Sequence, residues 1–302
     1  MSDLRYAVGV DVGGTKIAAA VIDSDGTILR KVKLATDRQD RDRSVAQVAL
    51  AAREAVAGAG LEWERIAAVG VDIPGIYYPK TGKVWAPNLP GWDHIPLRDY
   101  LEAQLPRPVV VDSDRSAYVL GEQWLGAARG FRDVVFVAVG TGIGAGILAG
   151  GRLVQGAEGI AGAVGWFALN PEKKDIYRQV GGWEGEAAGP AVARNAGTAT
   201  AEEAIERARR NDPAACLAVA GAAKYLGMGI ANLVSVLNPE IVVLGGGLMQ
   251  AGDLFLEPIR REMREWAQPL SGASVRIELT QLGEDAGLLG AARLGLEANL
   301  AR

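Results

Sequence analysis

Few residues of this chain can form disulfide bonds or soft metal sites. Its 302 residues include one cysteine, Cys216, and one histidine, His94. A single cysteine excludes an intrachain disulfide, and one thiolate with one distant imidazole is too few for a usual structural zinc site. We therefore expect no structural zinc. Cys216 lies in an alanine-rich segment and is predicted to be a small core residue of a helix.

Charge of one sign and long apolar runs are also scarce. The 32 basic and 36 acidic residues give a net charge of −4, so no basic surface is expected for nucleic acid or an anionic membrane. We find no apolar run long enough to span a bilayer. The N-terminus shows no charged and then apolar signal segment. The predicted setting is the cytoplasm, with no nucleic-acid and no membrane partner.

Glycine turns between apolar strands are the most informative feature that is present. Within residues 7–30, an apolar strand ends in Asp11, turns over Gly13-Gly14-Thr15 and returns as a second strand. Glycines at such a turn let backbone N–H groups approach an anion closely. Asp11 could hold a hydrated divalent cation beside it. A plain glycine-rich hairpin is the alternative, and it would be preferred if this motif stood alone.

A second copy of this pattern favours the functional interpretation. Residues 134–153 repeat the order of strand, glycine turn and strand, and Gly140-Thr141-Gly142 aligns with the first turn. Ala138 takes the place of Asp11. Such self-similarity predicts two related halves, each with a phosphate-binding hairpin. Two hairpins facing one cleft suit a polyphosphate chain, and the one retained acid suits a single metal-binding side.

The hydrophobic pattern predicts an α/β fold. Further strands are expected at 66–73, 108–111, 240–244 and 274–279. Helices are expected at 44–60, 97–105, 115–126, 187–195, 200–210, 213–237 and 285–298. Strands that alternate with helices are typical of parallel or mixed sheets. The chain is long enough for two compact domains.

Four motifs in this order resemble the ROK family of sugar kinases and repressors, within the actin, hexokinase and Hsp70 superfamily. Residues 11–16 and 140–144 are similar to its two phosphate motifs, 86–92 to its sugar-contacting loop and 244–247 to its adenosine-binding loop. The resemblance covers nearly the whole chain. It implies two ribonuclease H-like, or actin-like, domains with mixed sheets that flank a nucleotide and substrate cleft.

The resemblance also implies domains, cofactors and partners. The small domain would be residues 1–114 with the C-terminal helix 290–302, and the large domain 115–289. ATP and Mg²⁺ are the implied cofactors, a sugar or cyclitol the substrate, and a homodimer the assembly. Only residues 1–6 precede the strand that leads into the first phosphate motif, where the family's repressors carry a helix-turn-helix, so no DNA binding is expected. A non-catalytic metabolite-sensing protein on the same fold is the alternative.

The resemblance assigns nucleotide and phosphate contacts to the glycine turns. Asp11 would also bind Mg²⁺, and Lys16 would neutralise phosphate charge unless it is simply solvent-exposed. A plain strand-to-helix turn at 245–247 is equally compatible with close approach of adenosine. The implied cofactor-binding residues are Asp11, Gly13, Gly14, Thr15, Lys16, Gly140, Thr141, Gly142, Gly245, Gly246 and Gly247.

Asp114 is the predicted catalytic base. It follows the strand 108–111 and begins a helix, and ligand sites form at strand ends in α/β sheets. A carboxylate there can orient an alcohol and accept its proton during phosphoryl transfer. Without the family resemblance, the sequence supports this role and a helix N-cap equally. The match to the family's catalytic aspartate favours the base.

The sugar-contacting residues depart from the family pattern. Ser113 replaces an asparagine, and Ala163 and Trp166 replace a glutamate and a histidine that bind sugar hydroxyls. Glu184 matches a further family ligand, with Glu186 as the alternative. Unmet hydrogen bonds would reject plain glucose, whereas an aromatic ring can stack on a sugar-like ring. The implied substrate-binding residues are Gly75, Asn88, Ser113, Asp114, Trp166 and Glu184.

Three residues near these positions have two interpretations each. Asn88 matches a sugar ligand, but it could be a turn residue before Leu89-Pro90. Arg115 could lie on a solvent-exposed helix face or contact an anionic group. Trp183 could stack on a ring or belong to the core. The sequence therefore predicts a carbohydrate kinase that is not tuned to plain glucose.

Overall fold

The computed structural model describes the backbone of residues 6–300 and the side chains of residues 6–298. The chain divides into two compact units. Unit 1 comprises the residues up to 129, the segment 155–161 and the residues from 284, and unit 2 comprises 130–154 and 162–283. The functional domain boundaries expected at residues 114 and 290 stay predictions.

Unit 1 contains a mixed sheet of five strands in the order β3-β2-β1-β4-β7. β1 to β3 are antiparallel, and β4 and β7 continue the sheet parallel to β1. The largely apolar β4 is buried along its whole length, as expected for a central parallel strand covered on both faces. The bounds are β1 Tyr6–Val12, β2 Lys16–Asp23, β3 Ile28–Ala35, β4 Ile66–Ile73 and β7 Val109–Ser113, and a separate hairpin is formed by β5 Ile76–Tyr78 and β6 Lys83–Trp85.

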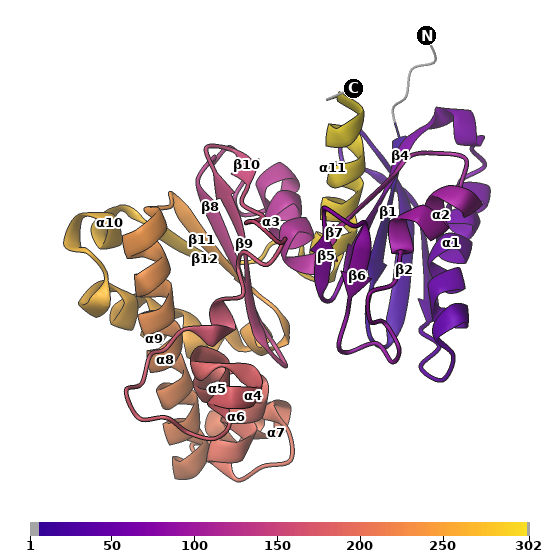
Figure 1. Ribbon diagram of the computed structural model, residues 1–302. Coiled ribbons are helices and arrows are strands. Elements are labelled where there is room, and N and C mark those ends of the chain that lie inside the picture. The colour runs from indigo at the N-terminus through magenta and orange to yellow at the C-terminus, as the bar shows by residue number, and fades with distance from the viewer. Residues whose placement is uncertain (1–5, 301–302) are drawn as a thin grey trace. The chain divides into compact units, whose positions relative to one another are not determined.

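Helices cover both faces of this sheet (Figure 1). α1 and α2 lie on one face, and α3 and α11 lie on the other. Glycines in the strands let α11 approach closely, since a Cβ on Gly70 would lie 1.7 Å from the carbonyl oxygen of Ala291. The bounds are α1 Arg41–Gly58, α2 Leu97–Gln104, α3 Asp114–Leu125 and α11 Ala286–Leu300.

Unit 2 repeats this topology with the strand order β10-β9-β8-β11-β12. Its first three strands are antiparallel, and β11 and β12 run parallel to β8. The order matches that of unit 1 strand for strand, which confirms the two related halves and the mixed α/β fold. The bounds are β8 Val134–Val139, β9 Ile143–Ala149, β10 Arg152–Leu153, β11 Ile241–Gly245 and β12 Arg276–Leu279.

Helices pack around α8 to form the core of unit 2. By length and composition α8 could cross a membrane, so the expectation that no apolar run is long enough was wrong. However, 56% of its most apolar stretch is buried inside the protein, as in a core helix. The bounds are α4 Tyr177–Val180, α5 Gly182–Ala187, α6 Gly189–Ala196, α7 Ala201–Arg209, α8 Pro213–Leu237, α9 Gly252–Trp266 and α10 Pro269–Ser274. Single 3₁₀ turns are formed by η1 Trp63–Arg65, η2 Val164–Trp166, η3 Gly247–Ala251 and η4 Gly283–Asp285.

The structure corrects two further expectations. Cys216 is exposed rather than a core residue, because the buried face of α8 carries its neighbours Ala215 and Ala218 instead. The strand expected at 274–279 begins only at Arg276, after α10 has ended. No element was predicted for α9, which is a helix of 15 residues.

Candidate functional site

Three neighbouring strands of unit 1 bring carboxyl groups to one edge of the sheet. Asp11 on β1 pairs with Asp72 on β4, and Asp72 pairs with Asp112 on β7. Ser113 ends β7, and Asp114 is the first residue of α3. This is the carboxyl edge of the parallel strands, where α/β proteins bind ligands. The structure thus groups Asp11 and Asp114, as the sequence suggested, and adds Asp72 and Asp112.

The environment of Asp114 differs from that of a helix cap. The N-cap of α3 is Ser113, whose hydroxyl accepts from the backbone N–H of Ser116 at 3.4 Å. One carboxylate oxygen of Asp114 accepts from the N–H of Arg115 at 2.8 Å. Burial raises the pKa of Asp114 to about 6, although the positive charge of Arg115 acts in the opposite direction. Such a carboxyl can take up a proton near neutral pH.

Asp72 is a buried acid that the sequence analysis missed. It is fully buried, and neither of its carboxylate oxygens has a hydrogen-bond partner of ordinary geometry within the described residues, although the backbone N–H of Val12 acts to lower its pKa. Burial raises its pKa well above the usual range, and the charges of Asp11 and Asp114 raise it further. Gly287 of α11 makes room for this acid, since a Cβ there would lie 3.1 Å from an oxygen of Asp72. When protonated, Asp72 can itself donate to the carboxylate of Asp11.

Asp11 lies between this acid and a group of charges from β2, β3 and η4. Burial raises its pKa, while the Asp72 carboxyl and the cations of Lys16 and Lys31 act in the opposite direction. Lys16 forms an exposed ion pair of 2.9 Å with Glu284, and Lys31 pairs with Asp285.

No group of three or more His, Cys, Asp or Glu side chains is arranged as a metal site within residues 6–298. Mg²⁺ is commonly held by one or two carboxylates, several waters and the phosphates of a nucleotide. Asp11 is partly accessible and lies beside a glycine turn, so it fits this water-rich mode of binding.

The first glycine turn is fixed by backbone contacts. The N–H of Gly13 donates to the carbonyl of Lys16 at 2.8 Å, and a Cβ on Gly13 would lie 2.8 Å from that same oxygen. The turn is adjacent to the predicted sugar loop, because an ideal Cβ on Gly14 would lie 3.6 Å from the carbonyl oxygen of Asn88. Thr15 and Asn88 are exposed. This part of unit 1 therefore has accessible groups beside the first glycine turn.

Gly75 contacts Arg115, the residue that follows Asp114. A guanidinium nitrogen of Arg115 donates to the carbonyl of Gly75 at 3.4 Å. The side chain of Arg115 is therefore directed toward the backbone of Gly75 rather than into solvent. A Cβ on Gly75 would lie 2.0 Å from the carbonyl oxygen of Trp85. Glycine is required at this position because the chain before the predicted sugar loop packs directly against it.

In unit 2 the two remaining glycine turns lie side by side. The N–H of Gly140 donates to the carbonyl of Gly142 at 2.9 Å. Gly245 at the end of β11 pairs with Ala138 on β8, and the N–H nitrogen of Gly247 lies 3.7 Å from an ideal Cβ on Gly140. Gly246 has a φ of +91°, which residues with a Cβ rarely adopt. The predicted phosphate turn and adenosine loop thus share the carboxyl edge of two parallel strands.

Of the two candidate acids on α5, Glu184 is the one beside the glycine turn. Its carboxylate accepts from the N–H of Ile143 at 2.8 Å, and burial raises its pKa. The same carboxylate lies next to Gly165, so it is close to η2. Glu186 is only 5% exposed and bonds to Lys174 and Tyr177 instead. These contacts favour Glu184 over Glu186 as a ligand residue.

The two tryptophans near this acid have different surroundings. Trp166 in η2 is 59% exposed and can present its ring to a ligand. Trp183 is fully buried and stacks on Phe167, with the ring centroids 5.7 Å apart. Trp183 is therefore a core residue, which was one of the two interpretations of its position in the sequence.

Comparison with known proteins agrees with this architecture. The model of the ROK family matches residues 7–298. A glucokinase of Halalkalibacterium halodurans is 34% identical over 312 aligned positions, which cover 96% of this chain and 94% of the relative. The chain therefore belongs to the ROK family.

Two solved structures extend this similarity to the fold. The ROK hexokinase from Thermus thermophilus matches with a TM-score of 0.86 and 34% identity over 98% of this chain and 100% of that one. A ROK family glucokinase from Streptomyces griseus, in complex with glucose and AMPPNP, matches with a TM-score of 0.78 and 33% identity. That match covers 97% of this chain and 99% of the other.

Proposed function

We propose that this protein is an ATP-dependent kinase that phosphorylates a hydroxyl group of a sugar or sugar-like ring. The observation that carries the proposal is Asp114, an acid at a strand end whose pKa of about 6 suits a proton acceptor. It lies in the same unit as Asp11 and the first glycine turn. Membership of the ROK family and the similarity to enzymes named glucokinase support the same reaction class.

Each part of the site then has a role. Asp114 orients the acceptor alcohol and takes its proton as the alcohol oxygen forms a bond to the γ-phosphorus and the bond to ADP breaks. The N–H groups of Gly13 and Gly140 donate within their own turns, so the N–H groups of Gly14, Thr15, Thr141 and Gly142 are the ones that bind phosphate oxygens. The loop 245–247 accommodates adenosine. Asp11 would hold Mg²⁺ through water, and the ion would supply charge neutralisation at the phosphates. Lys16 would partly release its ion pair with Glu284 and contact the phosphates instead.

The acceptor is proposed to be a ring other than plain glucose. Ala163 has no polar side-chain group, and Trp166 can donate from its indole N–H but cannot accept, so this pair cannot reproduce all the hydrogen bonds of a glutamate and a histidine. Ser113 is buried and caps α3, so its hydroxyl is already used. Trp166 instead offers an exposed flat face. A modified hexose, a cyclitol or a nucleoside-like ring suits this set, with Asn88 and Glu184 as polar contacts.

Substrate profiling tests the reaction and the specificity separately. Formation of ADP and of a phosphorylated product would be measured with hexoses, N-acetylated and deoxygenated hexoses and cyclitols, and nucleotide binding would be measured without acceptor. We expect transfer to at least one ring with a higher kcat/KM than for glucose. Nucleotide binding with no transfer to any ring would favour the metabolite-sensing alternative, and glucose as the best acceptor would contradict the specificity alone.

Domain organisation and assembly belong to the same proposal. We assign the catalytic Asp and the first phosphate turn to a small domain, 1–114 with 290–302, and the other glycine turns to a large domain, 115–289. The packing of α11 on β1 and β4 supports the return of the chain to the first domain. A cytoplasmic homodimer remains the proposed form.

A further inference from the structure

The predicted sugar loop is a compact closed turn. The N–H of Ala86 donates to the carbonyl of Trp92 at 2.9 Å. Leu89 makes two further backbone hydrogen bonds: its N–H donates to the carbonyl of Ala86, and its carbonyl accepts from the N–H of Trp92. Asn88 lies within this turn and is exposed. Because the turn is closed on itself, the position of Asn88 depends on how the whole turn is held.

Trp92 fastens this turn to the beginning of α1. Its side chain is 2% exposed, and the indole N–H donates to the hydroxyl oxygen of Ser44 at 2.8 Å. Ser44 is 1% exposed and donates its own hydroxyl hydrogen to the carbonyl of Arg41 at 2.7 Å. Gly91, with a φ of +76°, packs on the side chain of Arg41. The hydroxyl of Ser44 is therefore both donor and acceptor in a buried site.

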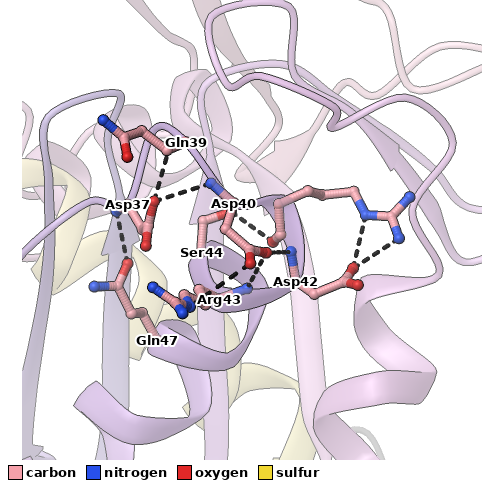
Figure 2. A network of polar contacts seen from close by, with 8 residues as sticks. Asp37, Gln39, Asp40, Asp42, Arg43, Ser44 and Gln47 are labelled. Carbon is pink, nitrogen blue, oxygen red and sulfur yellow. Dashed lines mark hydrogen bonds and ion pairs between the residues drawn. The ribbon is translucent and has the colours of Figure 1, made fainter.

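The beginning of α1 is itself held by a network of side chains (Figure 2). Asp40 caps the helix by accepting from the backbone N–H groups of Asp42 and Arg43 at 2.9 and 3.1 Å. Asp37 accepts from the N–H of Asp40 at 3.0 Å. The side chain of Gln47 accepts from the N–H of Asp37 at 2.9 Å. These contacts fix the first turns of the helix relative to the end of β3.

The same segment also holds the first glycine turn. Thr36 follows β3 directly and precedes the network of Figure 2. Its N–H donates to the carbonyl of Thr15 at 3.0 Å, and its hydroxyl donates to the carbonyl of Gly13 at 2.8 Å. The segment from Thr36 to Ser44 thus contacts the phosphate turn at one end and the loop 86–92 at the other.

We propose that Trp92 and Ser44 are a positioning pair that holds the acceptor-binding loop in place against the phosphate turn. The inference rests on the proposed function, because it takes Asn88 to contact the acceptor. Its physical basis is that phosphoryl transfer depends on the alignment of donor and acceptor, and small displacements reduce the rate strongly. A pair that holds only the loop should affect the acceptor more than the nucleotide.

Substitutions of the pair test this role in the full chain. Ser44→Ala removes the acceptor of the indole N–H, Trp92→Phe removes its donor, and Ser44→Thr keeps a hydroxyl. Ala51→Gly is the control, because it weakens α1 at a buried site without removing a polar contact. Initial rates would give kcat and both KM values, nucleotide binding would give a Kd, and thermal unfolding would report stability.

We expect Ser44→Ala and Trp92→Phe to raise the acceptor KM by about five- to tenfold, as for loss of one buried hydrogen bond. The Kd of the nucleotide should stay within about twofold, and Ser44→Thr should restore the acceptor KM. The double variant should be no worse than the poorer single variant, because both remove the same contact. Ala51→Gly should lower stability with an unchanged acceptor KM.

Four results would overturn the inference. An unchanged acceptor KM in active Trp92→Phe enzyme would exclude the positioning role while leaving the proposed function intact. Additive effects in the double variant, or equal shifts in Ala51→Gly, would show that only general stability is involved. No transfer by the unmodified protein to any ring would overturn both proposals. If Ser44→Ala does not fold, Trp92→Phe and Ser44→Thr decide the question.

Discussion

At the scale of single residues, the protonation of Asp114 should control the pH dependence of the reaction. Its pKa is about 6 against an ordinary value of 3.8, and a base must be deprotonated to accept a proton. We expect kcat/KM to be constant above about pH 7 and to fall about tenfold per pH unit well below pH 6. Nucleotide binding measured over the same range serves as the control. An acceptor kcat/KM that stays constant down to pH 5 would contradict the assignment.

Asp72 should lower the stability of the fold at neutral pH. Its folded pKa is raised, so the native state binds its proton more tightly than the unfolded chain does. Stability is therefore lost as the pH rises from about 4 toward the folded pKa. At pH 8 the free energy of unfolding of Asp72→Asn should exceed that of the unmodified protein by about 1–3 kcal/mol. The variant should therefore unfold at a higher temperature or denaturant concentration.

The difference for Asp72→Asn should shrink as the pH falls through 4 to about 3, where the aspartate of the unmodified protein is largely protonated in both the folded and the unfolded state. Ser116→Ala, which changes a neighbour of Asp112 rather than Asp72, provides the comparison. A variant that is equally or less stable than the unmodified protein at pH 8 would show that Asp72 has a compensating contact.

The acids of unit 1 show how far single residues could be read from the sequence. Asp11, Asp72 and Asp112 each follow a valine at the end of a buried strand. Asp11 is followed by the Gly13-Gly14 turn that recurs at 140–142, whereas Asp72 is followed by the single Gly75. Of these three acids, only Asp11 therefore attracted a functional hypothesis. The paired register of β1, β4 and β7 is what places the three side by side, and register between strands distant in the chain cannot be derived from local patterns.

At the scale of elements, the sequence predicted those with a strong period or a clear stop. The long helix α8 was placed to the residue, and the strands around the two glycine turns were expected in the right order, although β3 extends beyond the expected range to Ala35. α9 was missed, and Pro258 in its interior is a signal against a helix. The exposure of Cys216 could not be predicted, because alanine and leucine occur on both faces of α8 there. Packing against the core decides which face of α8 is buried, and amino-acid composition does not reveal it.

The segment around η2 should determine which ring is accepted. Gly165 packs beside the carboxylate of Glu184, so side chains at 163 and 166 project from a backbone next to that acid. Ala163→Glu combined with Trp166→His should increase kcat/KM for glucose by about tenfold or more, since each restored buried hydrogen bond contributes about 1 kcal/mol. Trp166→Phe keeps an aromatic face and should leave glucose a poor acceptor.

The double variant is compared with the unmodified protein on glucose and on its best other ring. Unchanged discrimination between the two rings would show that η2 does not contact the acceptor. Efficient use of glucose by the unmodified protein would mean that other residues supply the missing hydrogen bonds.

At the scale of the whole molecule, the repeat was the feature that the sequence revealed best. Two glycine hairpins predicted two related halves, and both sheets have the same strand order. The path of the chain between the units was harder to predict. The segment 155–161 belongs to unit 1 although both of its neighbours belong to unit 2. A hydrogen bond of 2.7 Å from the side chain of Gln155 to the carboxylate of Asp112 helps to hold this segment in unit 1. No local sequence pattern predicts such a contact.

The protein should fold and act without zinc. Cys216 and His94 are its only thiol and imidazole, and a usual structural zinc site needs four such ligands. The expected zinc content by elemental analysis of purified protein is well below one per chain, with no loss of activity after treatment with a zinc chelator in the presence of excess Mg²⁺. About one tightly bound zinc per chain, removed together with activity, would contradict this.

The central claim is that Asp114 is the base of an ATP-dependent sugar kinase. The most direct measurement compares the Asp114→Asn variant with the unmodified protein, using the best acceptor for product formation and a nucleotide titration for binding. An amide keeps the shape of the side chain but cannot accept the proton, so we predict a loss of turnover of about 10²- to 10⁴-fold with nearly unchanged nucleotide affinity. Near-normal turnover by a folded Asp114→Asn variant would contradict the account.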